Sequence, residues 1–153
     1  MTAATDARTS ADSATDGQLA TFWLDGDLYG VEVEHVQEVL KSQGLTRVPL
    51  APPAVAGLIN LRGQVVTAIE LRERLGRPPR PEGTDAVVIV VRLHGEAVSL
   101  LVDSIADVVD VNANDFEAPP DTLEGQARDL IRGAYKLSDH LLLALDVQKA
   151  VSA

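Results

Sequence analysis

The side chains best suited to acid–base or metal chemistry in this chain are widely scattered. The chain has three histidines, His35, His94 and His140. None of them stands with a second histidine or an acid at a recognised metal-ligand or catalytic spacing. Asp25 and Asp27 bracket a turn glycine, and Glu32 and Glu34 stand where acids favour the start of a helix. We therefore expect no catalytic site and no bound metal or cofactor, and an enzyme or small-ligand barrel would need dispersed residues to converge.

Glycine and acid patterns give no further support for catalysis. The glycines of the central region are Gly57, Gly63, Gly76 and Gly83. They are too dispersed for a phosphate-binding loop, and no nucleophile elbow or kinase signature is present. Asp103, Asp107 and Asp110 could line a surface for a cationic partner, but such charges commonly keep an edge strand soluble, and we favour that interpretation. An interaction module becomes the leading class.

One arginine stands out by its position. In the run from Gly57 to Arg72, two apolar segments flank a short polar turn that contains Arg62 and Gly63. The pattern predicts a β-hairpin, since glycine readily supplies the positive φ that a tight turn needs. Arg62 is then presented at the tip, where a solvated charge and a binding residue are both reasonable interpretations. A planar guanidinium on a stiff hairpin is well suited to pair with a partner's carboxylate.

Composition narrows the class of partner. The chain has a formal net charge of −10, 46% hydrophobic residues and 3% aromatic residues. Few aromatics and a negative charge both argue against nucleic-acid binding, which relies on stacking and on phosphate attraction. Absence of cysteine fits a reducing compartment, so the cytoplasm is the default location. The polar segment 1–17 lacks a signal-like or membrane-spanning run and is expected to be a flexible tail.

Short apolar runs separated by turn residues predict an all-β protein with short helices, as a barrel or sandwich. Glu32 to Leu40 is read as one helical turn running into a strand, and Val87 to Val111 as a second antiparallel sheet. The other expected elements are a hairpin of Leu19 to Leu24 with Leu28 to Val31, a hairpin of Ile131 to Leu137 with Leu141 to Leu145, and a final helix 147–152 capped by Asp146.

At these same residues the chain resembles the CheW family of chemotaxis coupling proteins. The family pattern includes a Gly-x-x-Asn-Leu-Arg-Gly-x-x-x-Pro-x-x-Asp-Leu hairpin, which here runs from Gly57 to Leu71. It also includes an early strand pair at Phe22 to Val31, a Val-x-Glu-Val segment at Val36 to Val39, and a Val-Asp run at Val102 to Val108. The resemblance covers nearly the whole region after the tail.

The resemblance implies two SH3-like five-stranded β-barrels packed together in a domain 18–153, with subdomains near 18–75 and 84–147 and exchange of strands allowed. It implies a non-enzymatic cytoplasmic adaptor at receptor arrays that joins chemoreceptor tips to the regulatory domain of a CheA-type histidine kinase. The residues carried over to the receptor-facing surface are Val36, Glu38, Gly57, Asn60, Arg62 and Val108. Kinase-contact residues are not assigned. An adaptor of a parallel pathway, such as one controlling pili, remains the alternative.

Two positions depart from the family pattern. Thr67 stands where the family usually has proline, and Glu70 where it usually has aspartate. A threonine restores a backbone N–H donor to the second hairpin strand, and the longer acid can reach a different partner. Neither change removes the turn that carries Arg62.

Overall fold

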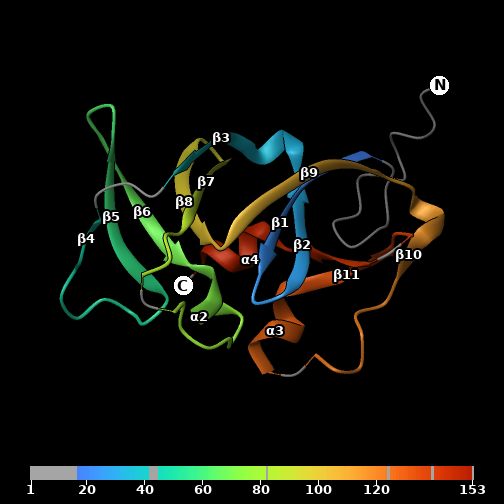
Figure 1. The fold of residues 1–153 in the computed structure, drawn as a ribbon. Coiled ribbons are helices and arrows are strands. Elements are labelled where there is room, and N and C mark those ends of the chain that lie inside the picture. Colours follow the sequence, from blue (N-terminus) through green and yellow to red (C-terminus); the bar gives the residue numbers. More distant parts are fainter. Residues whose placement is uncertain (1–16, 42–44, 82, 124, 139, 153) are drawn as a thin grey trace.

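The computed structural model describes residues 17–41, 45–81, 83–123, 125–138 and 140–152 (Figure 1). The expected tail 1–17 lies outside these residues except for Gly17, which begins the first strand. The described chain is mostly β-strand with short helices, as predicted. None of its helices is long and apolar enough to cross a bilayer.

In the described parts of the chain, twelve strands form two sheets, which we call sheet A and sheet B. Sheet A contains, in spatial order, β10 (Phe116–Glu117), β11 (Ile131–Lys136), β12 (Leu141–Leu145), β2 (Asp27–Glu32), β1 (Gly17–Leu24) and β9 (Ser104–Val111). Sheet B contains β3 (Val36–Lys41), β7 (Val87–Leu93), β8 (Glu96–Val102), β6 (Gln64–Glu70), β5 (Val55–Leu61) and β4 (Leu45–Thr46). Each sheet thus has the expected five longer strands and one additional two-residue strand. Neighbours are antiparallel except β12 with β2 and β6 with β8.

Short helices lie between strands and after the last strand. They are η1 (Val33–His35), α2 (Leu71–Arg74), η2 (Ala113–Asp115), α3 (Gly125–Leu130) and α4 (Val147–Val151). The helical turn running into a strand after Glu32 is confirmed as η1 followed by β3. Asp146 caps α4, because its Oδ1 accepts a hydrogen bond from the Lys149 amide at 3.1 Å. The final helix is therefore where the sequence placed it.

Strand pairing corrects the expected sheet over Val87 to Val111. β7 and β8 pair with each other, but β9 pairs with β1 in sheet A. Only Asp103 separates β8 from β9, and one residue is too short for a hairpin turn, so the chain continues from one sheet into the other. The sheets consequently do not follow the ranges 18–75 and 84–147. Sheet A joins the first two strands to the last four, and sheet B takes everything from β3 to β8.

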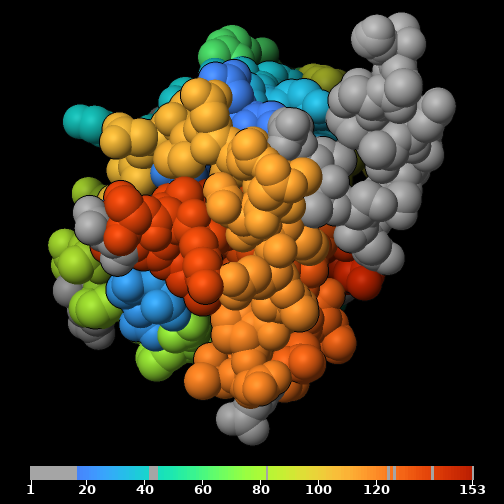
Figure 2. All heavy atoms as spheres, turned by 90° about the vertical axis from the view of Figure 1, so that its right-hand side faces the viewer, coloured from blue at the N-terminus to red at the C-terminus, as the bar shows by residue number. Residues whose placement is uncertain are grey.

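Three apolar clusters hold the two sheets. A central cluster lies between them and includes Phe22 and Tyr29 from sheet A with Ile89 and Leu100 from sheet B. A second cluster belongs to sheet B, and a third, around Tyr135 and Leu142, belongs to sheet A. Each sheet therefore curves around its own core, which fits a pair of small barrels packed together. On the side of sheet A, the gold-to-orange residues of β9 to α3 form a continuous band (Figure 2).

Candidate functional site

The hairpin of β5 and β6 carries Arg62 at its tip, as the sequence predicted, and it extends beyond the rest of sheet B (Figure 1). Arg62 and Gly63 form the two-residue connection with φ of +50° and +87°. Two positive φ values are typical of a type I′ turn, whose twist matches that of the flanking strands. Asn60 supports the turn, because its Oδ1 accepts a hydrogen bond from the Gly63 amide at 2.9 Å. The backbone thus presents Arg62 in a fixed direction.

Arg62 is exposed but paired. Its side chain is 71% exposed, and its guanidinium donates hydrogen bonds from both Nη atoms to the Glu38 carboxylate, with Nη1 at 2.7 Å from Oε2. This hydrogen bonding lowers the pKa of Glu38 and raises that of Arg62. An exposed pair of this kind contributes little to stability and is screened by salt. What the pair provides is a fixed orientation of the Arg62 guanidinium and the Glu38 carboxylate.

The pair also shows how sheet B is curved. β3 is the first strand in the spatial order of this sheet, whereas β6 and β5 come three and four strands later. Glu38 on β3 nevertheless reaches Arg62 at the end of β5. The sheet therefore curls until its two sides meet, and Leu40 of β3 packs against the same cluster as Ile59 and Leu61 of β5. The ion pair spans the gap between these two sides of the sheet.

Three of the exposed apolar side chains are valines on β3, β6 and β9. Val39 follows Glu38 on β3 and is 44% exposed, and Val65 follows the hairpin turn on β6 and is 61% exposed. Val108 is 56% exposed on β9 of sheet A. Successive side chains of a strand point to opposite faces, so Val39 lies on the other face of β3 from Glu38, and Val108 belongs to the other sheet.

The predicted surface residues do not all have the same role. Glu38, Asn60 and Arg62 are brought together, and Val36 is half-buried and packs against the central cluster. Gly57 is buried rather than surface-forming. A Cβ at Gly57 would lie 2.3 Å from the backbone oxygen of Thr46, so this glycine lets β4 approach β5. Its contribution to the site is to position the hairpin.

Both departures from the family pattern have clear places in the structure. Thr67 lies in β6 between β5 and β8, opposite Leu58 and Val98, so a strand flanks it on each side. Glu70 ends β6, and its carboxylate accepts hydrogen bonds from Arg80 Nη1 at 2.8 Å and from Nη2 at 3.2 Å. The longer acid thus reaches an arginine that the sequence did not assign to it.

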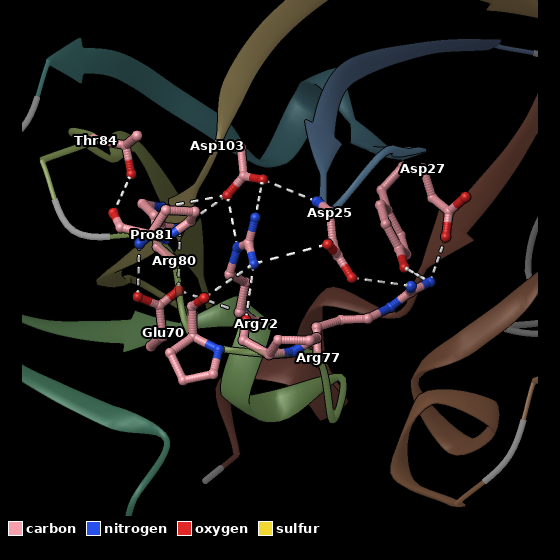
Figure 3. Close-up of polar contacts among 12 residues, drawn as sticks. Asp25, Asp27, Glu70, Arg72, Arg77, Arg80, Pro81, Thr84 and Asp103 are labelled. Carbon is pink, nitrogen blue, oxygen red and sulfur yellow. Dashed lines mark hydrogen bonds and ion pairs between the residues drawn. The ribbon is translucent and has the colours of Figure 1, made fainter.

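A second group of polar residues, shown in Figure 3, pairs acids noted in the sequence with arginines that the sequence did not assign to them. Asp103 does not lie on an edge strand as expected but pairs with Arg72 at 2.6 Å and with Arg80 at 3.2 Å. Asp25 and Asp27 pair with Arg77, which confirms their structural interpretation. Several arginines between residues 72 and 80 in a strongly acidic chain were the signal that could have indicated this network.

The histidines require one correction. His35 does lie with acids, because single ligand atoms of Glu32, Glu34 and His35 fall within 4.8 Å of one another. Exposed acidic groups of this kind are common without an ion, and His35 Nε2 is 3.6 Å from Glu32 Oε1. His94 lies in the turn between β7 and β8, and the ring of His140 packs edge-on against Trp23. Within the described residues, no other group of three or more possible metal ligands is present.

Comparison with known proteins identifies the family. The family model of the CheW-like domain matches residues 18–153. The chain belongs to the CheW-like family. It is 30% identical over 140 residues to "Chemotaxis protein CheW" of Treponema pallidum, covering 89% of this chain and 82% of the relative. Identity to the protein of the same name from Bacillus subtilis is 30% over 137 residues, covering 90% and 88% of the two chains.

A solved structure supports the same assignment. The scaffolding protein TtCheW from Thermoanaerobacter tengcongensis matches with a TM-score of 0.76 and 29% sequence identity, covering 86% of this CheW-like chain and 90% of that one. As a member of this family, the CheW-like protein is a non-enzymatic adaptor of chemotaxis signal transduction.

Proposed function

We propose that this CheW-like protein couples the cytoplasmic tips of chemoreceptors to the regulatory domain of a CheA-type histidine kinase within receptor arrays. The proposed receptor-facing surface is centred on the Arg62–Glu38 pair and takes in Val36, Asn60 and Val108, with Gly57 as a positioning residue. The observation that supports it best is the bidentate ion pair on a rigid turn. Kinase-contact residues remain unassigned.

The chemistry of Arg62 suits a partner that presents a carboxylate. A guanidinium has five N–H donors, and the bonds to Glu38 use one from each Nη atom. The remaining donors face solvent, because most of the Arg62 side chain is exposed. Glu38 holds the guanidinium in one orientation, so less side-chain freedom is lost when a partner binds. The exposed Val65, which pairs with Asn60 at the end of the hairpin, offers apolar contact near these donors.

Charge reversal at Arg62 tests this surface. We expect Arg62→Glu to leave the thermal unfolding midpoint almost unchanged and to weaken binding of a purified receptor tip at least tenfold, because a hydrogen-bond donor becomes a repelling carboxylate. Arg128→Glu is the matched control, since Arg128 is an exposed arginine on α3 and the change in net charge is identical. Binding that survives Arg62→Glu as well as it survives the control shows that the assigned surface is wrong.

A charge swap separates recognition from support of the fold. The double variant Arg62→Glu/Glu38→Arg can keep an ion pair between the hairpin and β3 but reverses the charges that a partner meets. We expect it to remain folded and still to bind the receptor tip poorly. Full recovery of binding would mean that the pair only supports the hairpin.

The alternative of a parallel chemosensory pathway uses the same kind of surface with other partners. Co-purification of the chain with the receptors and the CheA-like kinases of its own source organism distinguishes the two. Recovery of a kinase and receptor that control swimming supports the chemotaxis assignment, and recovery of a pilus-associated set supports the alternative.

A further inference from the structure

Asp103 occupies the point where the chain passes from sheet B to sheet A. It is the single residue between the last position of β8, Val102, and the first position of β9, Ser104. Its backbone N–H donates to the Trp23 carbonyl of β1 at 3.1 Å. Asp103 is therefore one of the two places where the chain connects the sheets, the other being η1 between β2 and β3.

The carboxylate of Asp103 receives hydrogen bonds from several parts of the fold (Figure 3). Arg72 of α2 donates from Nε at 2.9 Å and from Nη2 at 2.6 Å. Arg80 donates from Nε at 3.2 Å, and the backbone amide of Asp25, in the turn between β1 and β2, donates at 2.8 Å. Burial alone would raise the pKa of Asp103, but these partners outweigh it and the pKa is lowered. The carboxylate is thus held in its ionised form.

Arg72 is held as firmly as its partner. Its side chain is only 8% exposed, and besides the two bonds to Asp103 its Nη1 donates to the Pro78 carbonyl at 2.8 Å. Nη1 also lies 3.8 Å from Oδ1 of Asp25 in the β1–β2 turn. Because α2 directly follows β6 of sheet B, Arg72 connects the end of that sheet with the β1–β2 turn and with the crossing residue.

Flanking ion pairs extend the connection to either side. Arg80 bonds Glu70 at the end of β6 as well as Asp103. On the other side, Arg77 pairs with Asp27 of β2, and its Nη2 donates to the Tyr29 hydroxyl at 3.0 Å. The segment that follows β6 of sheet B therefore binds residues of sheet A through directional, charge-assisted hydrogen bonds.

We infer that Asp103, with Arg72 and Arg80, acts as a positioning joint that fixes the angle between sheet A and sheet B. The apolar cluster between the sheets is non-directional and tolerates sliding, whereas a bidentate guanidinium–carboxylate pair accepts only a narrow range of geometries. A scaffold that binds two partners must hold its docking faces in a fixed relative orientation. This functional consequence rests on the proposed coupling of receptor and kinase, whereas the joint itself does not.

The absence of native cysteine allows a direct test of the angle. Cysteines introduced at Val39 on β3 and at Lys136 on β11 are both exposed and lie on different sheets. Spin labels at these positions report the distribution of distances between the sheets by pulsed electron resonance. We expect one narrow distribution in the parent protein and a clearly broadened or two-component distribution after Asp103→Asn.

Asp107→Asn is the matched control, because it makes the same chemical change on exposed β9, four residues beyond the joint. We expect this variant to retain the narrow distribution. Arg72→Lys provides a milder second variant, since it keeps the charge but loses the bidentate fork, and it should broaden the distribution less than Asp103→Asn. All samples are measured well below their unfolding midpoints, so global unfolding does not contribute.

If the distance distributions of Asp103→Asn and Arg72→Lys are as narrow as that of the control, the inferred joint is wrong, even if both variants melt at a lower temperature. The functional consequence has its own measurement. We expect Asp103→Asn to bind a receptor tip and a kinase regulatory domain separately within about twofold of the parent, but to form less of the ternary complex. If the parent binds neither partner, the proposed function fails while the distance test of the joint still stands.

Discussion

Gly57 gives the most direct test of how the hairpin is built. Its φ is +154°, and an added Cβ would meet Thr46 O at 2.3 Å, Thr46 C at 2.9 Å and Arg47 Cα at 3.2 Å. All three atoms belong to backbone, so no flexible side chain can move aside. Gly57→Ala must therefore either strain β5 or push the β4 segment off the edge of sheet B.

The expected loss of stability has two parts. A non-glycine residue in a sparsely populated backbone region costs about 1–3 kcal/mol. Displacing β4, whose Leu45 and Thr46 pair with Ile59 and Leu58, loses one or two hydrogen bonds worth about 0.5–1.5 kcal/mol each. We expect a total near 2–4 kcal/mol, which for a domain of this size lowers the unfolding midpoint by roughly 5–15 °C.

Chemical and thermal unfolding of Gly57→Ala and Gly63→Ala measures this difference. Gly63 also has a positive φ, +87°, but its added Cβ would meet nothing within 4 Å. Gly63→Ala should therefore cost only the roughly 1–2 kcal/mol that a left-handed backbone conformation costs a non-glycine residue. If Gly57→Ala is no more destabilising than Gly63→Ala, the close contact with β4 does not constrain this position and the reasoning is refuted.

Three further predictions concern other parts of the molecule. Ser99 is fully buried and its hydroxyl has no hydrogen-bond partner among the described residues, so Ser99→Ala should raise the free energy of unfolding by about 1 kcal/mol in urea titrations; a loss of stability would reveal a missing partner. The folded pKa of Asp103 lies below its usual 3.8, so its contribution is present above that pH and disappears as the pH falls through the lowered folded value. The stability difference between the parent and Asp103→Asn should accordingly shrink below about pH 4 in acid titrations, and a difference that does not change with pH would contradict this assignment. Gly133→Ala should destabilise sheet A, because its Cβ would lie 2.3 Å from Phe116 Cζ and 2.6 Å from the Glu117 backbone oxygen; Gly17→Ala is the control, since Gly17 likewise lies outside the left-handed φ range and its added Cβ would meet nothing within 4 Å.

Local features of the fold were predictable because their signals are local. Alternating apolar residues and the Asp25-Gly26 turn predicted the first hairpin, and Asn60 to Gly63 predicted the turn that presents Arg62. The same run carried the family resemblance that the comparisons confirm. Glu38 was assigned to the site only through that resemblance, since nothing near it in sequence indicates its bond to Arg62, 24 residues away.

Pairings between distant segments could not be predicted in the same way. The residues from Val87 to Val111 look like one run of strands, yet β9 leaves sheet B for β1, more than 80 residues earlier in the chain. Asp103 therefore looked like a solubilising charge on an edge, and its ion pair with Arg72 became visible only when α2 and the β1–β2 turn were placed beside it.

The sequence by itself determined the β class, the tight turn at Arg62 and the adaptor family, because each depends on neighbouring residues or on a contiguous motif. Tertiary structure decided which strands share a sheet, which charge Arg62 faces, and that Asp103 stands at the crossing between the two sheets. These outcomes depend on which apolar faces are buried together and on which charges are thereby forced to find partners across long stretches of chain. Neither depends on any single stretch of sequence.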